Sequence, residues 1–338
     1  MRKSRKKTYI KIIKLNRIFK ILVVLIILIC IFVFLTEDKK VVTINEEKVY
    51  VGITTEESTK NIEVMGVEDI FFEEEKEIIV PKGYDMEKLK DPAYLKSNFY
   101  IVDSRTSFVA EDFNVEEFLK KDFTIEAGGE APKILIFHTH SHEDFCDSDG
   151  SDAETIYGIG EMLAETLSEK YNIPTMHDTG RYDYVDGKVQ ILGAYERMEP
   201  AVRKILEENP SIEMVIDLHR DGVDENIKLV TDIDGKPTAR IMFFNGLCKY
   251  LENGKLVNGA SNPYLEDNLA FSFQMQLKAG ELYPNFTRKV YLHAYRFSLH
   301  MKARSLLIEL GAQTNTIEEA KNAVEPLAEV IAGVLLDS

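Results

Sequence analysis

Short apolar runs alternate with amphipathic segments over the C-terminal two-thirds of the chain. Three runs have the length and composition of strands buried on both faces, namely residues 133–138 (KILIFH), 213–219 (EMVIDLH) and 305–311 (SLLIELG). A longer segment, residues 153–171, repeats apolar residues at helical spacing. This alternation is typical of α/β domains. We therefore predict a single α/β domain over residues 95–338, with a central, twisted, largely parallel sheet flanked by helices on both faces.

Other segments predict the remaining elements of this domain. Helical spacing of apolar residues recurs in residues 114–123, 194–209, 262–282 and 316–336. Residues 227–244 alternate around Asp234-Gly235, a dipeptide that favours the turn of a β-hairpin.

The N-terminal part of the chain has a different pattern. Residues 1–20 carry nine Lys or Arg and no acidic residue, and residues 21–35 contain no charged or polar side chain. A helix over the apolar run covers roughly 22 Å, and its flanks extend it toward the ~30 Å hydrocarbon core. We predict a cytoplasmic basic tail (1–20), a transmembrane anchor (21–35) and an acidic spacer (36–94), with the body outside the cytoplasm. No small-x-small site follows Leu35, which disfavours the alternative of a cleaved signal peptide.

Charge and cysteine content exclude some classes of function. The formal net charge is −16, although the first 20 residues are strongly basic. The rest of the chain is therefore even more acidic, and it would repel the phosphates of a nucleic acid. Cys146 and Cys248 could pair in an oxidising compartment, but they are too few for a disulfide framework and are expected to be free thiols. Because Cys146 lies near several histidines, metal ligation is the alternative for that residue.

Each of the three apolar runs ends in a group suited to metal ligation or acid–base chemistry. His138 ends the first run and His140 follows it, His219 ends the second, and Glu309 lies inside the third. Because ligands bind beyond the carboxyl ends of parallel strands, we expect these side chains to converge. Imidazole and carboxylate are the usual ligands of catalytic zinc. We predict a zinc ion (Zn²⁺) held by His140, Glu143 and His219, with Glu309 as the general base.

Several neighbouring polar residues have a structural alternative. His138 is also suited to fix the strand end by hydrogen bonding, and His142 to an exposed or supporting position. Asp217 and the Arg220-Asp221 pair are explained equally well by salt bridges. His177 and His293 have no context that suggests chemistry, whereas His300 precedes the Glu309 run and could support it.

Four blocks in order along the chain resemble a known family. They are ILIFHTHSHE from Ile134, VIDLHRDG from Val215, ARIMFFNG from Ala239 and FSLHMKARSLLIELGAQTNTIEEA from Phe297. Over about residues 95–338 they resemble the stage II sporulation protein P family of membrane-anchored peptidoglycan hydrolases, which act in forespore engulfment.

The same blocks resemble zinc N-acetylmuramoyl-L-alanine amidases more remotely. The D-P-G-H-G-G, S-x-H-A-N and E-x-G-F-x-S-N segments of those enzymes fall on His140, His219 and Glu309 respectively. Their acidic ligand corresponds to Glu154 here. An H-x-x-E motif like that of zinc carboxypeptidases favours Glu143 instead, so both glutamates remain candidates.

The family resemblance implies a substrate, partners and a location. The substrate would be the amide between muramic acid and L-Ala in peptidoglycan, with cross-link endopeptidase activity as a second possibility. The partners would be a lytic transglycosylase (stage II sporulation protein D) and a membrane protein (stage II sporulation protein M). The protein would be single-pass in the mother-cell membrane, with its catalytic domain facing the septal space.

Two other classes of function stay open. One is a zinc carboxypeptidase or other metallopeptidase, for which Arg220, Arg240 or Arg304 would bind a substrate carboxylate. The other is a non-catalytic wall-binding module that kept the fold. Intact His140, His219 and Glu309 argue against the second.

Overall fold

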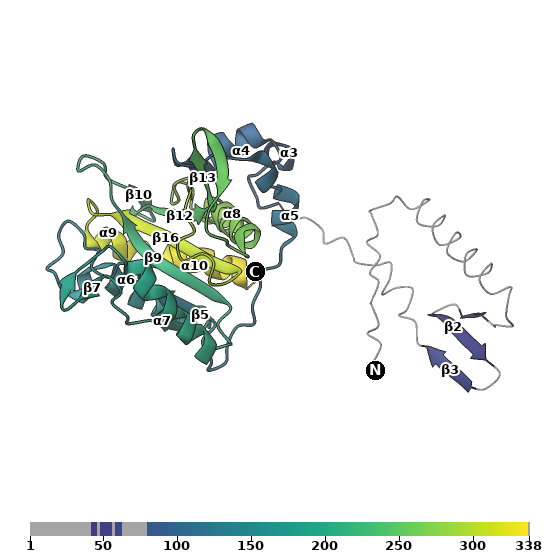
Figure 1. Cartoon of the computed structure of the whole chain (residues 1–338). Helices are drawn as coiled ribbons and strands as arrows, with labels where there is room; N and C mark the ends of the chain where they lie inside the picture. Colours follow the sequence, from purple (N-terminus) through teal and green to yellow (C-terminus); the bar gives the residue numbers. More distant parts are fainter. Residues whose placement is uncertain (1–41, 46–47, 56–57, 63–79, 337–338) are drawn as a thin grey trace. The chain divides into compact units, whose positions relative to one another are not determined.

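The computed structural model describes residues 42–45, 48–55, 58–62 and 80–336, in two compact units that divide after Lys76 (Figure 1). In the first unit, β1 (Val42–Asn45), β2 (Lys48–Thr55) and β3 (Ser58–Ile62) form an antiparallel sheet in that order. The expected anchor, residues 21–35, lies outside the described residues. None of the helices in the described ranges is long and apolar enough to cross a membrane.

The second unit is built on a seven-stranded sheet of its described residues. In spatial order, the strands are β4 (Tyr100–Val102), β15 (Val290–His293), β12 (Ile241–Gly246), β16 (Arg304–Ala312), β9 (Met214–Asp221), β5 (Ile134–Phe137) and β6 (Thr175–His177). Neighbours in this sheet pair in parallel, except that β12 and β16 are antiparallel. The prediction of a largely parallel sheet is therefore confirmed, but the sheet consists of two parallel blocks that run in opposite directions.

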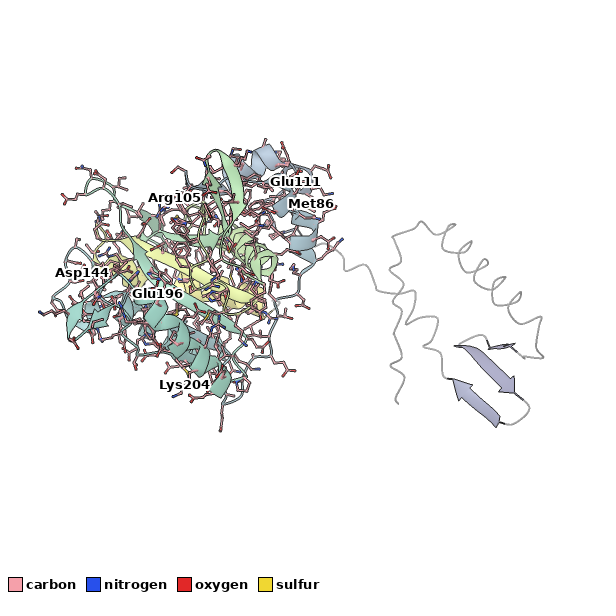
Figure 2. The ribbon with its side chains drawn as sticks, viewed as in Figure 1. Met86, Arg105, Glu111, Asp144, Glu196 and Lys204 are labelled. Carbon is pink, nitrogen blue, oxygen red and sulfur yellow. The ribbon has the colours of Figure 1, made fainter. Side chains whose placement is uncertain are left out.

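Helices cover both faces of this sheet, as expected. Their bounds are α6 (Ile156–Glu169), α7 (Ala194–Glu208), α8 (Leu265–Leu282), α9 (Ile317–Asn322) and α10 (Val324–Leu335). Figure 2 shows their side chains, with Glu196 labelled on α7. The segment 316–336 forms two helices rather than one. Pro326 lacks the N–H that would bond to the carbonyl of Asn322, so the chain breaks at Ala323 and starts again.

Period-two alternation along the strands separates the two faces. On β5, Ile134 and Ile136 pack into the large core that includes α6, α8 and α10. Leu135 and Phe137 point the other way and pack against Met198 and other residues of α7 in a smaller cluster. We call this second side of the sheet the α7 face.

The smaller elements lie around this framework. They are α3 (Met86–Leu89), α4 (Pro92–Asn98), α5 (Val115–Lys120), the 3₁₀ turns η1 (Ala110–Asp112) and η2 (Asp152–Glu154), and the hairpins β7–β8 (Tyr184–Val185, Lys188–Val189), β10–β11 (Val230–Ile233, Lys236–Ala239) and β13–β14 (Lys249–Glu252, Lys255–Asn258). The turn of β10–β11 is at Asp234 and Gly235, both with positive φ, as predicted. Helices α3 and α4 fall within or across the end of the expected spacer, and they bury Leu89 and Leu95 in the core of the second unit.

Candidate active site

Neighbouring strands place three acid–base side chains on the α7 face. His219 of β9 lies directly opposite Glu309 of β16 in the parallel register, and Asp217 lies two residues before His219. Residues two apart on a strand point to the same side of the sheet. The convergence of His219 and Glu309, predicted from the strand ends, is therefore present in the fold.

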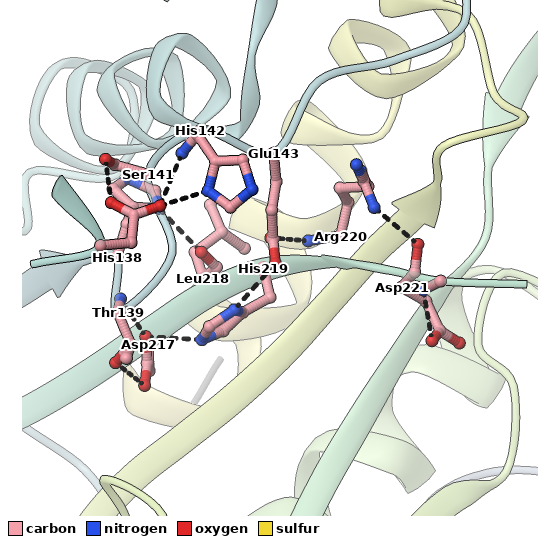
Figure 3. Close-up of polar contacts among 12 residues, drawn as sticks. His138, Thr139, Ser141, His142, Glu143, Asp217, Leu218, His219, Arg220 and Asp221 are labelled. Carbon is pink, nitrogen blue, oxygen red and sulfur yellow. Dashed lines mark hydrogen bonds and ion pairs between the residues drawn. The ribbon is translucent and has the colours of Figure 1, made fainter. Parts of the chain in front are cut away.

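His219 lies between two carboxylates, as Figure 3 shows. Its Nε2 is 2.8 Å from Asp217 Oδ1, and its Nδ1 is 3.5 Å from Glu143 Oε1. The first contact is an ion pair without hydrogen-bond geometry, since Nε2 has no hydrogen-bond partner. Burial by itself would lower the pKa of His219, but the charges of Asp217 and Glu143 outweigh burial and hold that pKa well above its ordinary value.

Two buried aspartates fix the loop that carries the histidine cluster. Asp217 accepts hydrogen bonds from Thr139 N at 3.0 Å and from Thr139 Oγ1 at 2.8 Å. Asp183 accepts from Ser141 Oγ at 2.7 Å and from His142 N at 3.1 Å. Glu143, at the end of this loop, accepts from Arg220 N at 2.8 Å through Oε2, which leaves Oε1 facing His219 (Figure 3). The loop is thus held at both ends by strand β9.

His140 extends from this loop toward His219. The two ring centroids are 5.4 Å apart, and Nδ1 of His140 is buried without a hydrogen-bond partner. Burial, followed by repulsion from His219, lowers the pKa of His140. A lowered pKa favours the neutral imidazole of His140, which is the form that binds metals.

One carboxyl oxygen of Glu309 has no hydrogen-bond partner to offset its burial. Its Oε2 is fully buried and unbonded, although other atoms of the residue are partly exposed. Burial is the main reason that the pKa of Glu309 is raised to about 8; the charge of His219 opposes that shift, and the nearby carboxylates add to it. With this pKa the carboxyl group is mostly protonated at pH 7, so it must ionise before it can accept a proton.

Comparison with known proteins identifies the family. The family model described as stage II sporulation protein P matches residues 37–332. The chain belongs to the stage II sporulation protein P family. A curated relative, stage II sporulation protein P of Bacillus subtilis (strain 168), is 22% identical over 234 residues, which are 65% of this chain and 55% of that protein. The resemblance found in the sequence is thus confirmed, although the chain matches little more than half the length of that relative.

Solved amidase structures match part of the chain. An N-acetylmuramoyl-L-alanine amidase from Clostridium difficile 630 has 17% identity and a TM-score of 0.37, covering 62% of this chain and 97% of its own. The amidase AmiC2 of Nostoc punctiforme has 14% identity and a TM-score of 0.38, covering 62% and 98%. TM-scores below 0.5 do not establish a common fold, so the assignment to this family rests on the family model.

Two of the clustered histidines, His138 and His142, contact groups other than His219. His138 points away from the α7 face, where its Nδ1 is 2.7 Å from Leu218 O and its Nε2 is 3.0 Å from His177 Nε2. Burial lowers the pKa of His138 to about 3. The Nδ1 of His142 contacts Asp183. These positions agree with the alternative roles expected for both residues.

The remaining candidate residues contact partners outside the group of His140, Glu143, His219 and Glu309. Glu154 Oε2 accepts from Asp149 N at 2.7 Å, so it caps a loop, whereas Glu143 faces His219. His293 is 2.6 Å from Arg105 Nη2, and His300 is 2.9 Å from Glu199 Oε1. Cys146 and Cys248 are free thiols, as expected.

The fit of these residues to a zinc ion is partial. Two zinc ligands ~2.0–2.1 Å from the ion at a tetrahedral angle lie about 3.4 Å apart. His219 Nδ1 and Glu143 Oε1, at 3.5 Å, have that separation, and the unbonded Nδ1 of His140 supplies a third candidate ligand atom nearby. However, no three His, Cys, Asp or Glu side chains within the described ranges are grouped so that they could hold a metal as they stand. The zinc ligand set therefore stays a prediction.

The arginines proposed for a carboxypeptidase clamp are already engaged. Arg220 Nε donates to Asp144 O at 2.7 Å, Arg240 Nε to Asn285 O at 2.9 Å, and Arg304 Nε to Phe123 O at 3.2 Å. None of the three is directed freely at the site, so nothing here favours the carboxypeptidase alternative.

Sequence reasoning did not identify Asp183 and Tyr195 as parts of the site. Asp183 lies in a loop rich in Asp and Tyr, and no pattern there marks it as buried. Tyr195 lies in the first turn of α7, with its ring centroid 5.9 Å from that of His140. An aromatic residue at helical spacing is normally a core residue, so the sequence alone could not place Tyr195 beside His140.

Proposed function

We propose that this chain is a zinc-dependent peptidoglycan hydrolase that cleaves the N-acetylmuramoyl-L-alanine amide during forespore engulfment. The observation that carries the proposal is the meeting of His140, Glu143, His219 and Glu309 on one face of the sheet. Family membership supports the sporulation context, and the amidase-like segments found in the sequence support the choice of bond.

His140, Glu143 and His219 would hold the zinc ion. When bound, zinc would supply Lewis-acid polarisation of the amide carbonyl and lower the pKa of a water molecule. A dication beside Glu309 would also favour the ionised form of that carboxyl, against the effect of its burial.

The chain's own groups account for the proton movements. Glu309 takes a proton from the attacking water through its unbonded oxygen, as the water oxygen bonds to the carbonyl carbon. It then returns the proton to the nitrogen of L-Ala as the carbon–nitrogen bond breaks. Asp217 holds the orientation of His219, because a carboxylate behind a liganding histidine fixes its ring and tautomer.

Location, partners and a second activity belong to the same proposal. Residues 21–35 anchor the protein in the mother-cell membrane with the hydrolase domain facing the septal space, where peptidoglycan lies. Stage II sporulation proteins D and M are the proposed partners, and cleavage of stem-peptide cross-links is the proposed second activity. Alkaline extraction of membranes tests the anchor: full-length protein should stay in the pellet, and a form starting after Leu35 would contradict it.

Mass spectrometry of products released from purified murein tests the activity. An amidase releases stem peptides that begin with a free L-Ala amine and leaves intact glycan, and a chelator should stop the release. Cleavage between stem peptides alone would indicate an endopeptidase instead. Loss of C-terminal residues alone would indicate a carboxypeptidase.

A further inference from the structure

A cavity of about 320 Å³ adjoins the candidate active site. It lies between the first turns of α7 and the loop that follows β15, and its lining includes Tyr195, Glu196, Glu199, Tyr295, Arg296 and Phe297. The same Tyr195 ring packs edge-on against His140, with the centroids 5.9 Å apart. One side chain therefore forms the wall between this cavity and the candidate zinc ligands.

The aromatic wall of the cavity is held in place by tight packing. Phe297 has a φ of 51°, a left-handed conformation that is unfavourable for a bulky residue unless its surroundings impose it. Its ring packs against those of Tyr195 at 5.6 Å and Phe244 at 4.9 Å. The loop approaches β12 at Gly246, where a Cβ atom would lie 1.9 Å from Tyr295 O. The wall is thus preformed at a cost in backbone strain, as is common at ligand sites.

Tyr295 offers the exposed aromatic surface of this cavity. It is 54% exposed, and the guanidinium of Arg105 lies 5.5 Å from its ring centroid. A large, exposed aromatic ring held by a neighbour is a surface for stacking rather than part of a core.

The charged residues of the cavity decide which part of the proposed substrate fits. Glu199 is paired with Arg296 at 3.2 Å and with His300 at 2.9 Å, whereas Glu196 is exposed and makes no ion pair among the described residues. The lining therefore has an excess of carboxylate. It repels the acidic stem peptide, but its oxygens are good acceptors for the hydroxyl and amide donors of a neutral sugar.

We propose that this cavity binds a neutral N-acetylated sugar ring of the glycan strand, next to the muramoyl group whose amide is cleaved. Tyr295 would stack on the ring, and Glu196 would accept hydrogen bonds from it. The inference rests on the proposed function, since it assigns the glycan side of the same substrate. Pockets of this size and mixed lining are typical of small-ligand sites.

Calorimetric titration of the full-length protein tests the site without requiring hydrolysis. Glu309→Gln is the background, so that binding is measured apart from hydrolysis. The probes are N-acetylglucosamine trisaccharide and the tripeptide L-Ala-D-Glu-meso-diaminopimelate. Tyr295→Ala is the test variant, and Tyr250→Ala is the matched control, because Tyr250 is a half-exposed tyrosine of β13 outside the cavity.

The trisaccharide should bind to the background and to the Tyr250 variant equally, and about tenfold more weakly to the Tyr295 variant, as expected when an interface aromatic is removed. Equal affinity of the Tyr295 and Tyr250 variants would overturn the inference. So would an absence of trisaccharide binding, or a loss confined to the tripeptide. Failure of the wild-type protein to release peptides from murein is a separate readout and would count against the proposed function.

Discussion

Replacing Asp217 with Asn should weaken zinc binding while leaving the ligands themselves in place. The side chain is fully buried, and its Oδ1 lies 2.8 Å from His219 Nε2. Burial would raise the pKa of Asp217, but the charge of His219 and the hydrogen bond from Thr139 N hold it at about 2, so the group is ionised at pH 7. Asparagine keeps the shape and the oxygen that faces His219, but it removes the negative charge.

The size of the effect follows from what the carboxylate does. Loss of a carboxylate behind a liganding histidine typically costs 10–100-fold in metal affinity. That is about 1.4–2.7 kcal/mol. The amide can still bond to both Thr139 N and Thr139 Oγ1, since the hydroxyl can rotate to accept. The free energy of unfolding should therefore fall by less than the ~1–3 kcal/mol of a fully unsatisfied buried group.

Competition with a chelating indicator measures the zinc dissociation constant of each full-length variant, and circular dichroism checks that it is folded. Asp144→Asn is the control, since Asp144 is 61% exposed and pairs with Arg220 on the outside of the same loop. We expect the control to bind zinc as the wild type does. A folded Asp217→Asn protein with wild-type zinc affinity would refute the role of Asp217 and weaken the assignment of His219 as a ligand.

Three further predictions concern other parts of the fold. Glu309→Gln should lower the rate of amide cleavage ~10²–10⁴-fold, the usual contribution of a general acid–base group, and keep the zinc; zinc loss measured by metal analysis would make Glu309 a ligand instead. Gly246→Ala should lower the free energy of unfolding by ~1–3 kcal/mol, as overpacking does, because the new Cβ meets Tyr295 O. Urea titration measures this change, with Gly222→Ala as the control, because Gly222 has open space around it. Equal free energies of unfolding for the two variants would contradict the close approach at Gly246. His300 and Arg203 outweigh burial and hold the pKa of Glu199 at about 2, below its ordinary 4.5; its contribution to stability should be present above pH 4.5 and be lost as the pH falls toward 2. Urea titrations at pH 7 and pH 3 should show a smaller acid loss for Glu199→Gln than for the wild type, and an identical loss would exclude this linkage.

The apolar pattern predicted the strands and helices that fill the core, because burial on both faces produces continuous apolar runs such as those of β5 and β16. It did not predict β4 and β15, which have three and four residues. The reversal between β12 and β16 was also missed, since strand direction depends on long-range pairing rather than on local sequence.

The same distinction holds at the candidate site. His219 and Glu309 could be placed together because each ends or interrupts an apolar strand, and a buried carboxyl group is costly. His138 and His140 could not be told apart in the same way. Their difference arises because the chain leaves β5 at Phe137, after which His138 faces the α6 side and His140 bends back toward His219. Asp217 looked like an ordinary salt-bridge partner until its contacts were known.

The central position of β16 has a consequence for biogenesis. This strand joins the two blocks of the sheet. It begins at Arg304, so the other six strands of the sheet all precede it in the sequence. A chain still being synthesised exposes open edges on both β9 and β12, which are templates for aggregation and targets for proteolysis. Glu309 lies on the same strand, so a chain that ends before β16 lacks both the continuous seven-stranded sheet and the proposed base. The proposed hydrolytic activity would therefore appear only after β16 has emerged and paired with β9 and β12.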